Sequence, residues 1–253
     1  EEAFTEGRTP EDWLRWIYDR TRQNAAAMEI ELPSLEELRE KGTHKIPAPA
    51  EPHVMLAGFR ADPEGAPLDT PSGRIELFSE VIAGFGYDDC PPHPAWLEPV
   101  EWLGGGDGLH LMSNQPKGKL HSQLDHGAHC RSLRPDGREV LTLHPADAAA
   151  RGIAAGDRLR VYNDRGWCLA SAALSEGVRP GVVQMSTGAW YDPAVDAEGR
   201  PGCRHGNPNV LTLDKGTSRL AQGPIAHSCM VEVVRDDSGM EPAPFEPPVL
   251  VER

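Results

Sequence analysis

The chain has 253 residues, and its 25 Lys and Arg residues against 39 Asp and Glu residues give a net charge of −14. This length suits one large domain or two smaller ones. The negative charge argues against nucleic acid or an anionic membrane surface as a partner, and no segment approaches the ~18 consecutive apolar residues of a membrane-spanning helix.

The cysteines indicate the cellular compartment, and the first residues indicate whether the chain is a whole protein. The five cysteines are odd in number and form no C-x-x-C pair. This usage argues against a disulfide framework and a structural zinc site, and it favours a reducing compartment. The chain begins with Glu1 rather than Met and shows no secretory-leader pattern, so we expect a fragment of a longer protein.

Residues 1–45 carry the signals of two helices. Thr9 followed by Pro10 is typical of a helix start, and Ser34 with Glu37 forms a capping-box pattern. Gly42 is the expected C-terminal cap of the second helix.

The next segment is irregular and rich in turn residues. Residues 47–52 are Pro-rich and suggest a boundary. Residues 68–80 are expected to form a turn that leads into a short strand. Residues 87–108, which contain several prolines and a run of glycines, have the composition of an interdomain linker.

From residue 109 onwards, short apolar runs alternate with turn residues about every ten positions, the pattern of a small barrel or sandwich. One helix is expected at 145–151, with Pro145 at its first position. Residues 163–166 are expected to form a hairpin turn in which Gly166 takes a positive φ. The expected strands lie at 109–112, 139–143, 157–162, 167–174, 181–186 and 229–234.

Polar loops follow several of these strands. The densest, 113–127, combines amides, hydroxyls and two lysines. Amide side chains suit the edge of a fused heterocycle, and lysines suit a phosphate. Further polar loops lie at 184–191, 205–209 and 217–224. Loops of this kind are often simply solvated, so a ligand rim and a plain surface are both open at this point.

Metal binding is a second possibility for the first polar loop. His121, His126, His129 and Cys130 have the side chains of zinc ligands. Their spacing fits no standard zinc pattern, and the chain holds no dinucleotide-binding G-x-G-x-x-G after a strand, no P-loop and no H-E-x-x-H.

Several ordered motifs together resemble the C-terminal molybdopterin-dinucleotide-binding domain of the dimethyl sulfoxide reductase family, in its biotin sulfoxide and trimethylamine-N-oxide reductase branch. A turn at 70–77 is similar to the segment that precedes this domain in the family, and the helix and strand at 144–157 also match. The remaining motifs are SNQP at 113–116, LHSQ at 120–123, NDRG at 163–166, STGAWY at 186–191, GNPN at 206–209 and TSRLAQ at 217–222.

The resemblance implies a mainly β fold with three parts. Residues 109–234 would form a double-psi β-barrel. Residues 1–108 would be the helical and irregular end of upstream catalytic domains plus a linker, and 235–253 would be an acidic, Pro-rich tail. The family's molybdenum ligand lies upstream, so no residue of this chain is assigned as a metal ligand or as catalytic.

The resemblance also implies which residues contact the cofactor. The family's arginine before the Leu-His-Ser step is Lys119 here, which puts a direct role for this position in doubt. Gln115, His121, Ser122 and Gln123 would line one edge of a pyranopterin, and Asn209 and Gln222 would meet its other edge. The turn at 163–166 and the loop at 186–190 would hold the guanosine and pyrophosphate, with Asp164 suited to guanine and Arg165 to phosphate. The full expected set is Ser113, Asn114, Gln115, His121, Ser122, Gln123, Asn163, Asp164, Arg165, Gln184, Ser186, Thr187, Trp190, Asn209, Gln222 and Gly223.

The implied function is that of the cofactor-binding part of an oxidoreductase with bis(molybdopterin guanine dinucleotide) molybdenum. It would reduce a small S- or N-oxide by oxygen-atom transfer, and the isolated chain would be inactive. The alternatives are a formate dehydrogenase or nitrate reductase, a non-enzymatic double-psi barrel that binds a ligand, and a plain structural domain. The expected location is cytoplasmic, with twin-arginine export to the periplasm as the alternative. The electron donor is not indicated.

Overall fold

The computed structural model describes residues 2–243 and 251. The chain divides into two compact units, residues 1–76 and 77–253, and each is described by itself. The predicted division at residue 109 stays a prediction.

The first unit consists of short helices. These are α1 (Glu2–Thr5), α2 (Pro10–Ala27), α3 (Leu35–Lys41) and α4 (Ala57–Ala61). The predicted caps are confirmed, because Thr9 and Ser34 form capping boxes and Gly42 has a φ of 74°. The helix α1 was not predicted.

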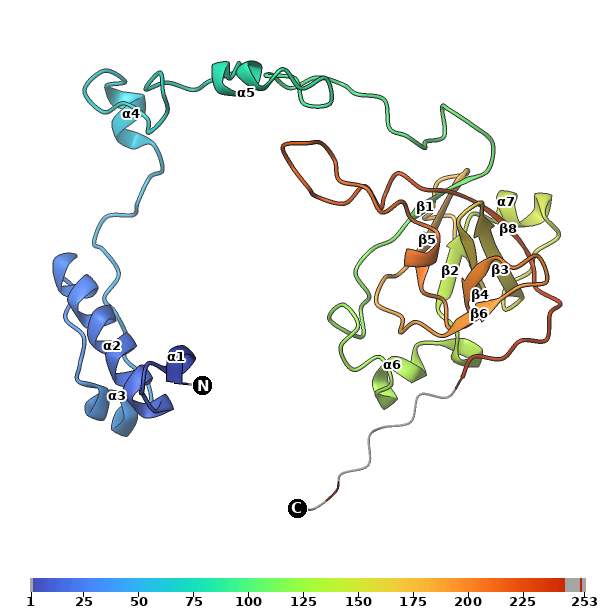
Figure 1. Cartoon of the computed structure of the whole chain (residues 1–253), viewed down its shortest axis with the longest axis horizontal. Coiled ribbons are helices and arrows are strands. Elements are labelled where there is room, and N and C mark those ends of the chain that lie inside the picture. Colours follow the sequence, from blue (N-terminus) through green and yellow to red (C-terminus); the bar gives the residue numbers. More distant parts are fainter. Residues whose placement is uncertain (1, 244–250, 252–253) are drawn as a thin grey trace. The chain divides into compact units, whose positions relative to one another are not determined.

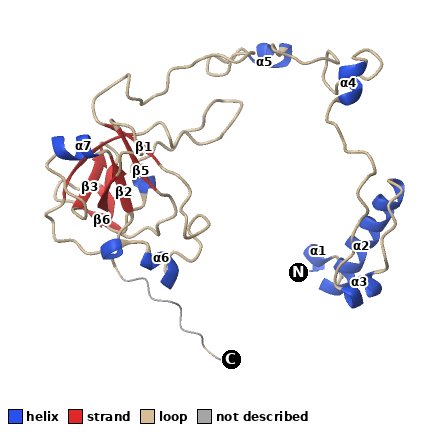
Figure 2. Cartoon of the chain, turned by 180° about the vertical axis from the view of Figure 1, so that it is seen from behind, coloured by secondary structure: helices blue, strands red, loops and turns tan. Residues whose placement is uncertain are grey.

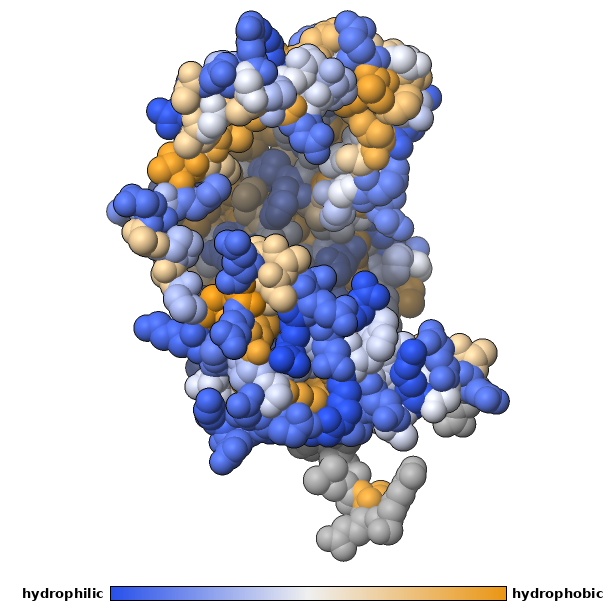
Figure 3. Space-filling view, turned by 90° about the vertical axis from the view of Figure 1, so that its left-hand side faces the viewer, coloured by the Kyte–Doolittle hydropathy of each residue, from blue (hydrophilic) through white to orange (hydrophobic). Residues whose placement is uncertain are grey.

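Two features define the surface of this first unit. Helices α2 and α3 are joined by ion pairs from Arg15 and Arg39 to acidic partners on the other helix. Leu14, Trp16 and Ile17 of α2 stay exposed, and apolar patches interrupt the mostly hydrophilic surface in Figure 3.

The second unit is built around β-strands. A helix α5 (Glu80–Phe85) precedes them, and α6 (Ala128–Ser132) and α7 (Pro145–Ala150) lie near opposite ends of the barrel (Figures 1 and 2). The strands are β1 (Leu109–Met112), β2 (Val140–Leu143), β3 (Arg158–Asn163), β4 (Gly166–Leu174), β5 (Val182–Met185), β6 (Pro193–Val195), β7 (Pro201–Cys203) and β8 (Met230–Arg235). Short 3-10 turns occur at Pro135–Gly137 and Pro208–Val210.

Six of these strands close into a barrel. Their order is β2-β5-β1-β8-β3-β4, and β2 also pairs with β4, which completes the ring. The β1–β5 and β2–β4 pairs are parallel, whereas the other pairs in the ring are antiparallel. The predicted double-psi β-barrel is confirmed.

Alternate residues of the barrel strands fill its core, as the period-2 geometry of a strand requires. Strand β4 is buried along most of its length, because it pairs with β2, β3 and β7. The other strands contribute every second residue to the buried core, namely Leu109, Leu111, Leu141, Leu143, Leu159, Val161, Val183, Met185, Val231 and Val233.

Two local predictions were wrong. Residues 68–80 contain no strand, and instead Ser79 accepts a hydrogen bond from the Ile82 backbone and starts α5. Gly166 does not have a positive φ. Its lack of a side chain matters for packing, because a Cβ there would lie 2.6 Å from the carbonyl oxygen of Pro201.

Strands β6 and β7, which the sequence did not predict, form a hairpin on the outer edge of β4. The described part of the predicted tail packs onto the barrel. Buried Arg138 donates to the carbonyl oxygen of Met240 at 2.9 Å and pairs with Glu241 at 2.8 Å. The rest of the tail, apart from Val251, lies outside the described residues.

Candidate cofactor site

Three segments that lie far apart in the chain line one cavity of about 380 Å³ on the barrel unit. This volume falls within the roughly 300–1,000 Å³ of ordinary ligand pockets. The segments are the loops after β1 and β5 and the turn after β7. The lining residues are His121, Ser122, Thr187, Gly188, Ala189, Trp190, Tyr191, Asn207 and Asn209.

The first two loops are held in direct contact. The indole Nε1 of Trp190 donates a 2.8 Å hydrogen bond to the carbonyl oxygen of Ser122. Gly188 has a φ of 89°, and a Cβ at this position would collide with the carbonyl oxygen of His121. The site therefore depends on glycine at 188, both for its backbone conformation and for the close approach.

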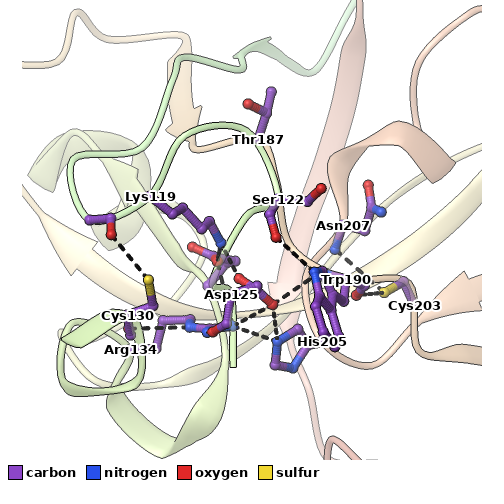
Figure 4. Close-up of polar contacts among 12 residues, drawn as sticks. Lys119, Ser122, Asp125, Cys130, Arg134, Thr187, Trp190, Cys203, His205 and Asn207 are labelled. Carbon is purple, nitrogen blue, oxygen red and sulfur yellow. Dashed lines mark hydrogen bonds and ion pairs between the residues drawn. The ribbon is translucent and has the colours of Figure 1, made fainter. Parts of the chain in front are cut away.

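A cluster of buried charged side chains lies beside this cavity (Figure 4). Asp125 is fully buried, and its carboxylate accepts hydrogen bonds from Lys119, from Arg134 at 3.2 Å and from the backbone of Trp190 at 3.2 Å. The His205 Nε2 atom lies 3.1 Å from the same carboxylate. Lys119 also reaches Glu139 at 2.6 Å.

This environment fixes the charge state of Asp125. Burial by itself would raise the pKa of the carboxyl, but hydrogen bonds from His205 and Lys119, with the charge of Arg134, hold the pKa well below its ordinary value. Asp125 is therefore an anion throughout the physiological pH range. The ammonium of Lys119 is paired with the buried carboxylates of Asp125 and Glu139. The expectation that this position has no direct role in ligand binding stays a prediction.

A second cavity, of about 240 Å³, shares the loop after β1 with the first. The predicted site residues Asn114, Gln184 and Ser186 line it. Gln184 donates to the side chain of Asn114, and the backbone of Thr187 donates to the Asn114 carbonyl at 2.9 Å. Of the other predicted residues in this loop, Ser113 is buried, and Gln115 lies 3.4 Å from His121 through their side-chain nitrogens.

The predicted turn at 163–166 lies at a third cavity of about 410 Å³, with Glu101 and Asp107 among its lining residues. Asn163 donates to the carbonyls of Leu211 and Met230 at 2.9 and 3.1 Å. Arg165 forms a two-pronged pair with Glu101 at 2.5 and 2.9 Å. These polar groups already have partners within the chain.

The remaining predicted residues lie outside these three cavities. Gln123 is exposed on the loop after β1. Gln222 and Gly223 belong to a loop that projects from the barrel (Figure 1) and is closed by a bridge between Gly216 and Pro224. The Gln222 amide donates to the Ser218 carbonyl at 2.9 Å. The structure thus places half of the expected set, eight of sixteen residues, around these first two cavities and the others elsewhere.

Metal binding was the alternative for the first polar loop. Among residues 2–243 and 251, no group of three or more His, Cys, Asp or Glu side chains is arranged to hold a metal ion. The buried thiol of Cys130 lies 3.1 Å from the carbonyl of Gly118, and His126 packs against Trp190 with ring centroids 4.8 Å apart.

Sequence reasoning missed several residues around the main cavity. Asp125 and His205 lie within loops that were identified as polar, but their burial was not predicted. Arg134 and Glu139 lie outside those loops, and nothing local marks them, because their partners are distant in sequence. Tyr191 and Asn207 line the cavity and adjoin expected residues.

Comparison with known proteins identifies the barrel. Residues 109–230 match the family described as the molydopterin dinucleotide binding domain. The chain is 47% identical to biotin sulfoxide reductase of Cereibacter sphaeroides over 91% of this chain and 31% of that protein. It is 42% identical to trimethylamine-N-oxide reductase 1 of Escherichia coli K12 over 95% of this chain and 29% of that protein.

The chain belongs to the dimethyl sulfoxide reductase family of molybdopterin enzymes. It spans about a third of the length of the curated relatives that it matches. The acetylene hydratase of Pelobacter acetylenicus has the same fold, with a TM-score of 0.55 and 22% identity over 69% of this chain and 25% of that protein.

The side chains at the main cavity fit a molybdopterin. The cavity offers an imidazole from His121, hydroxyls from Ser122 and Thr187, and side-chain amides from Asn207 and Asn209. Such groups donate and accept hydrogen bonds at short range, which suits the alternating donors and acceptors of a pterin edge. This donor set is that of a site for a polar heterocycle.

Proposed function

We propose that this chain is the cofactor-binding part of an enzyme that carries bis(molybdopterin guanine dinucleotide) molybdenum and reduces small S- or N-oxides. The observation that carries the proposal is the 42–47% identity to named sulfoxide and N-oxide reductases over more than nine-tenths of the chain. The molydopterin dinucleotide binding domain at 109–230 supports the pterin half of the cofactor assignment.

Different residues would bind the pterin and the guanine of the cofactor. His121, Ser122, Thr187 and Asn209 would hydrogen-bond the pterin at the main cavity, while Asp164, at the third cavity, would accept hydrogen bonds from guanine. The bound cofactor supplies oxygen-atom transfer and electron storage. The chain itself binds the cofactor, orients it and excludes water from its pterin edge.

The test is purification of the longer protein followed by cofactor analysis and turnover. Biotin sulfoxide, dimethyl sulfoxide and trimethylamine N-oxide are each supplied with a chemically reduced dye. We expect molybdenum, pterin and guanine in a ratio of one to two to two, and turnover of at least one oxide. A fully loaded protein that is inactive on all three oxides but oxidises formate or reduces nitrate contradicts the substrate class.

For location we propose the cytoplasm. The support is that all five cysteines are free thiols, four of them buried, as is usual for proteins of reducing compartments. Cell fractionation tests this, and recovery of the mature protein from the periplasm contradicts it. Among the described residues, no helix is long and apolar enough to cross a bilayer.

A further inference from the structure

One buried carboxylate connects all three segments that form the main cavity. Asp125 belongs to the loop after β1, and its Oδ2 atom accepts from the backbone nitrogen of Trp190 in the loop after β5. The same oxygen lies 3.1 Å from the imidazole of His205, next to the turn that carries Asn207. Figure 4 shows these contacts converging on Asp125 from both sides.

The charges around Asp125 are balanced and enclosed. Lys119 and Arg134 are each less than 5% exposed, and their positive charges face the carboxylates of Asp125 and Glu139. A buried ion cluster of this kind is costly to disturb, because removal of one charge leaves another without compensation. The cluster therefore fixes one arrangement of the loops that carry it.

The loop after β1 needs such support. His121 and Leu124 have φ values of 51° and 57° although neither is glycine. Left-handed backbone in residues with side chains is strained and persists only where the surrounding contacts enforce it. Lys119 and Asp125 lie on either side of this stretch, and the indole of Trp190 holds Ser122 within it.

We propose that Asp125 is a positioning residue for the cofactor site. It touches no ligand itself. It holds the loop after β1 in the strained form that presents His121 and Ser122 to the cavity, and it ties that loop to the one that carries Thr187 and Trp190. This inference rests on the proposed function for its ligand, a molybdopterin, but its structural part concerns the loops alone.

The test compares two buried carboxylates by substitution to the isosteric amide. Asp125→Asn is matched by Asp196→Asn, since Asp196 is also buried, accepts from the backbone of Arg200 at 2.8 Å, and pairs with Arg200 and Arg160. Asp196 lies between β6 and β7 and lines none of the three cavities. The full-length protein, loaded with cofactor, is used for both variants and the wild type.

Two quantities are measured at denaturant concentrations that give equal global stability. We expect Asp125→Asn to release molybdopterin about tenfold faster than wild type. We also expect hydrogen–deuterium exchange to rise about tenfold in peptides covering 119–127 and 186–192. Asp196→Asn should leave both quantities within about twofold of wild type, because Asp196 supports the β6–β7 hairpin and not the loops of the cofactor site. Equal effects of the two variants, or unchanged exchange in Asp125→Asn, overturn the proposal.

A milder variant decides the matter if Asp125→Asn does not fold. Trp190→Phe keeps an aromatic ring but removes the hydrogen bond to Ser122, and it leaves every buried charge in place. We expect hydrogen–deuterium exchange at 119–127 to rise in this variant as well. Unchanged exchange there would contradict the proposal. If the wild-type protein holds no molybdopterin, the proposed function is wrong. The exchange comparison between the Asp125 and Asp196 variants still tests the role of Asp125 in that case.

Discussion

At the scale of single residues, polar side chains serve two separate purposes around the barrel. His121, Ser122 and Asn209 present polar groups to the main cavity. Lys119 and Asp125 instead form an ion pair with each other inside the protein. Residue type alone does not separate these purposes, since a lysine and an aspartate in a polar loop would equally suit a ligand. Burial separates them.

Replacement of His121 by alanine tests the first group. We expect cofactor affinity to fall about ten- to a hundredfold, because one hydrogen bond to a polar ligand is worth on the order of 1–3 kcal/mol. The melting temperature of the cofactor-free protein should change little, since His121 is exposed. Molybdenum content after dialysis and thermal unfolding measure the two effects.

His227→Ala is the control for that experiment, because His227 is an exposed histidine outside the three cavities. It should retain wild-type cofactor content. If His121→Ala also retains full molybdenum and full turnover, the role assigned to His121 is wrong.

The depressed pKa of Asp125 predicts how stability depends on pH. Its folded pKa lies below the unfolded value of about 3.9, so the charged carboxylate stabilises the fold at every pH above that value. This contribution is lost as pH falls from about 4 through the folded pKa. We expect the free energy of unfolding of the wild type to decline more steeply below about pH 4 than that of Asp125→Asn. Denaturant titrations between pH 7 and pH 3 measure both slopes, and parallel curves would show that Asp125 does not titrate in this way.

At the scale of elements, the barrel supplies a rigid frame and the loops supply the site. Closure of six strands leaves no open edge within the ring. The connections after β1 and β5 are thereby brought to one cavity, although β1 ends at Met112 and β5 at Met185. The turn after β7, which pairs with the edge of β4, completes the cavity. Contact between these connections then depends on individual glycines and hydrogen bonds.

Gly188→Ala tests one such contact against a matched glycine. Gly152 also has a positive φ, of 64°, but a Cβ there would meet nothing within 4 Å. We expect Gly152→Ala to cost roughly 1–2 kcal/mol from backbone strain alone. Gly188→Ala should cost more and should also lower cofactor affinity, because its Cβ would push against the His121 carbonyl. Chemical denaturation and cofactor content measure these effects, and equal losses in both variants would show that the close approach is unimportant.

At the scale of the whole molecule, the chain holds one cofactor-binding barrel and a separate helical unit. The relatives that it resembles are about three times as long. In the proposed enzyme we expect the molybdenum ligand to lie outside this chain, as the family resemblance implies.

The 253-residue chain by itself is expected to show no oxide-reductase activity, even when supplied with the dinucleotide cofactor. Catalysis requires a metal centre held on all sides in a preorganised, water-poor site, and this chain offers one face of it. Turnover of the three oxides with a reduced dye, by the chain and by the longer protein under identical conditions, makes the comparison. Activity of the chain alone would overturn the proposed division of labour.

Local signals in the sequence predicted the caps of two helices, the strands of the barrel and the family. Thr9, Ser34 and Gly42 set helix ends through contacts with residues three or four positions away, so their effect is readable locally. All six barrel strands were located within about a residue because alternating apolar positions mark a strand that faces a core. The expected polar loops are mostly irregular, but Gln184 and Met185 belong to β5 and Pro208–Val210 form a 3-10 turn.

Which of those loops meet depends on how the barrel folds. Barrel closure brings partners from distant segments to these side chains. Asn163 contacts Leu211, and Arg165 contacts Glu101. Asp125 is buried beside Lys119 and Arg134 for the same reason. The short strands β6 and β7 exist because the edge of β4 was available to pair with them. Local sequence specifies backbone conformation through neighbours along the chain, whereas the burial and ionic environment of a side chain depend on residues more than 100 positions away, as for Arg138 and Glu241.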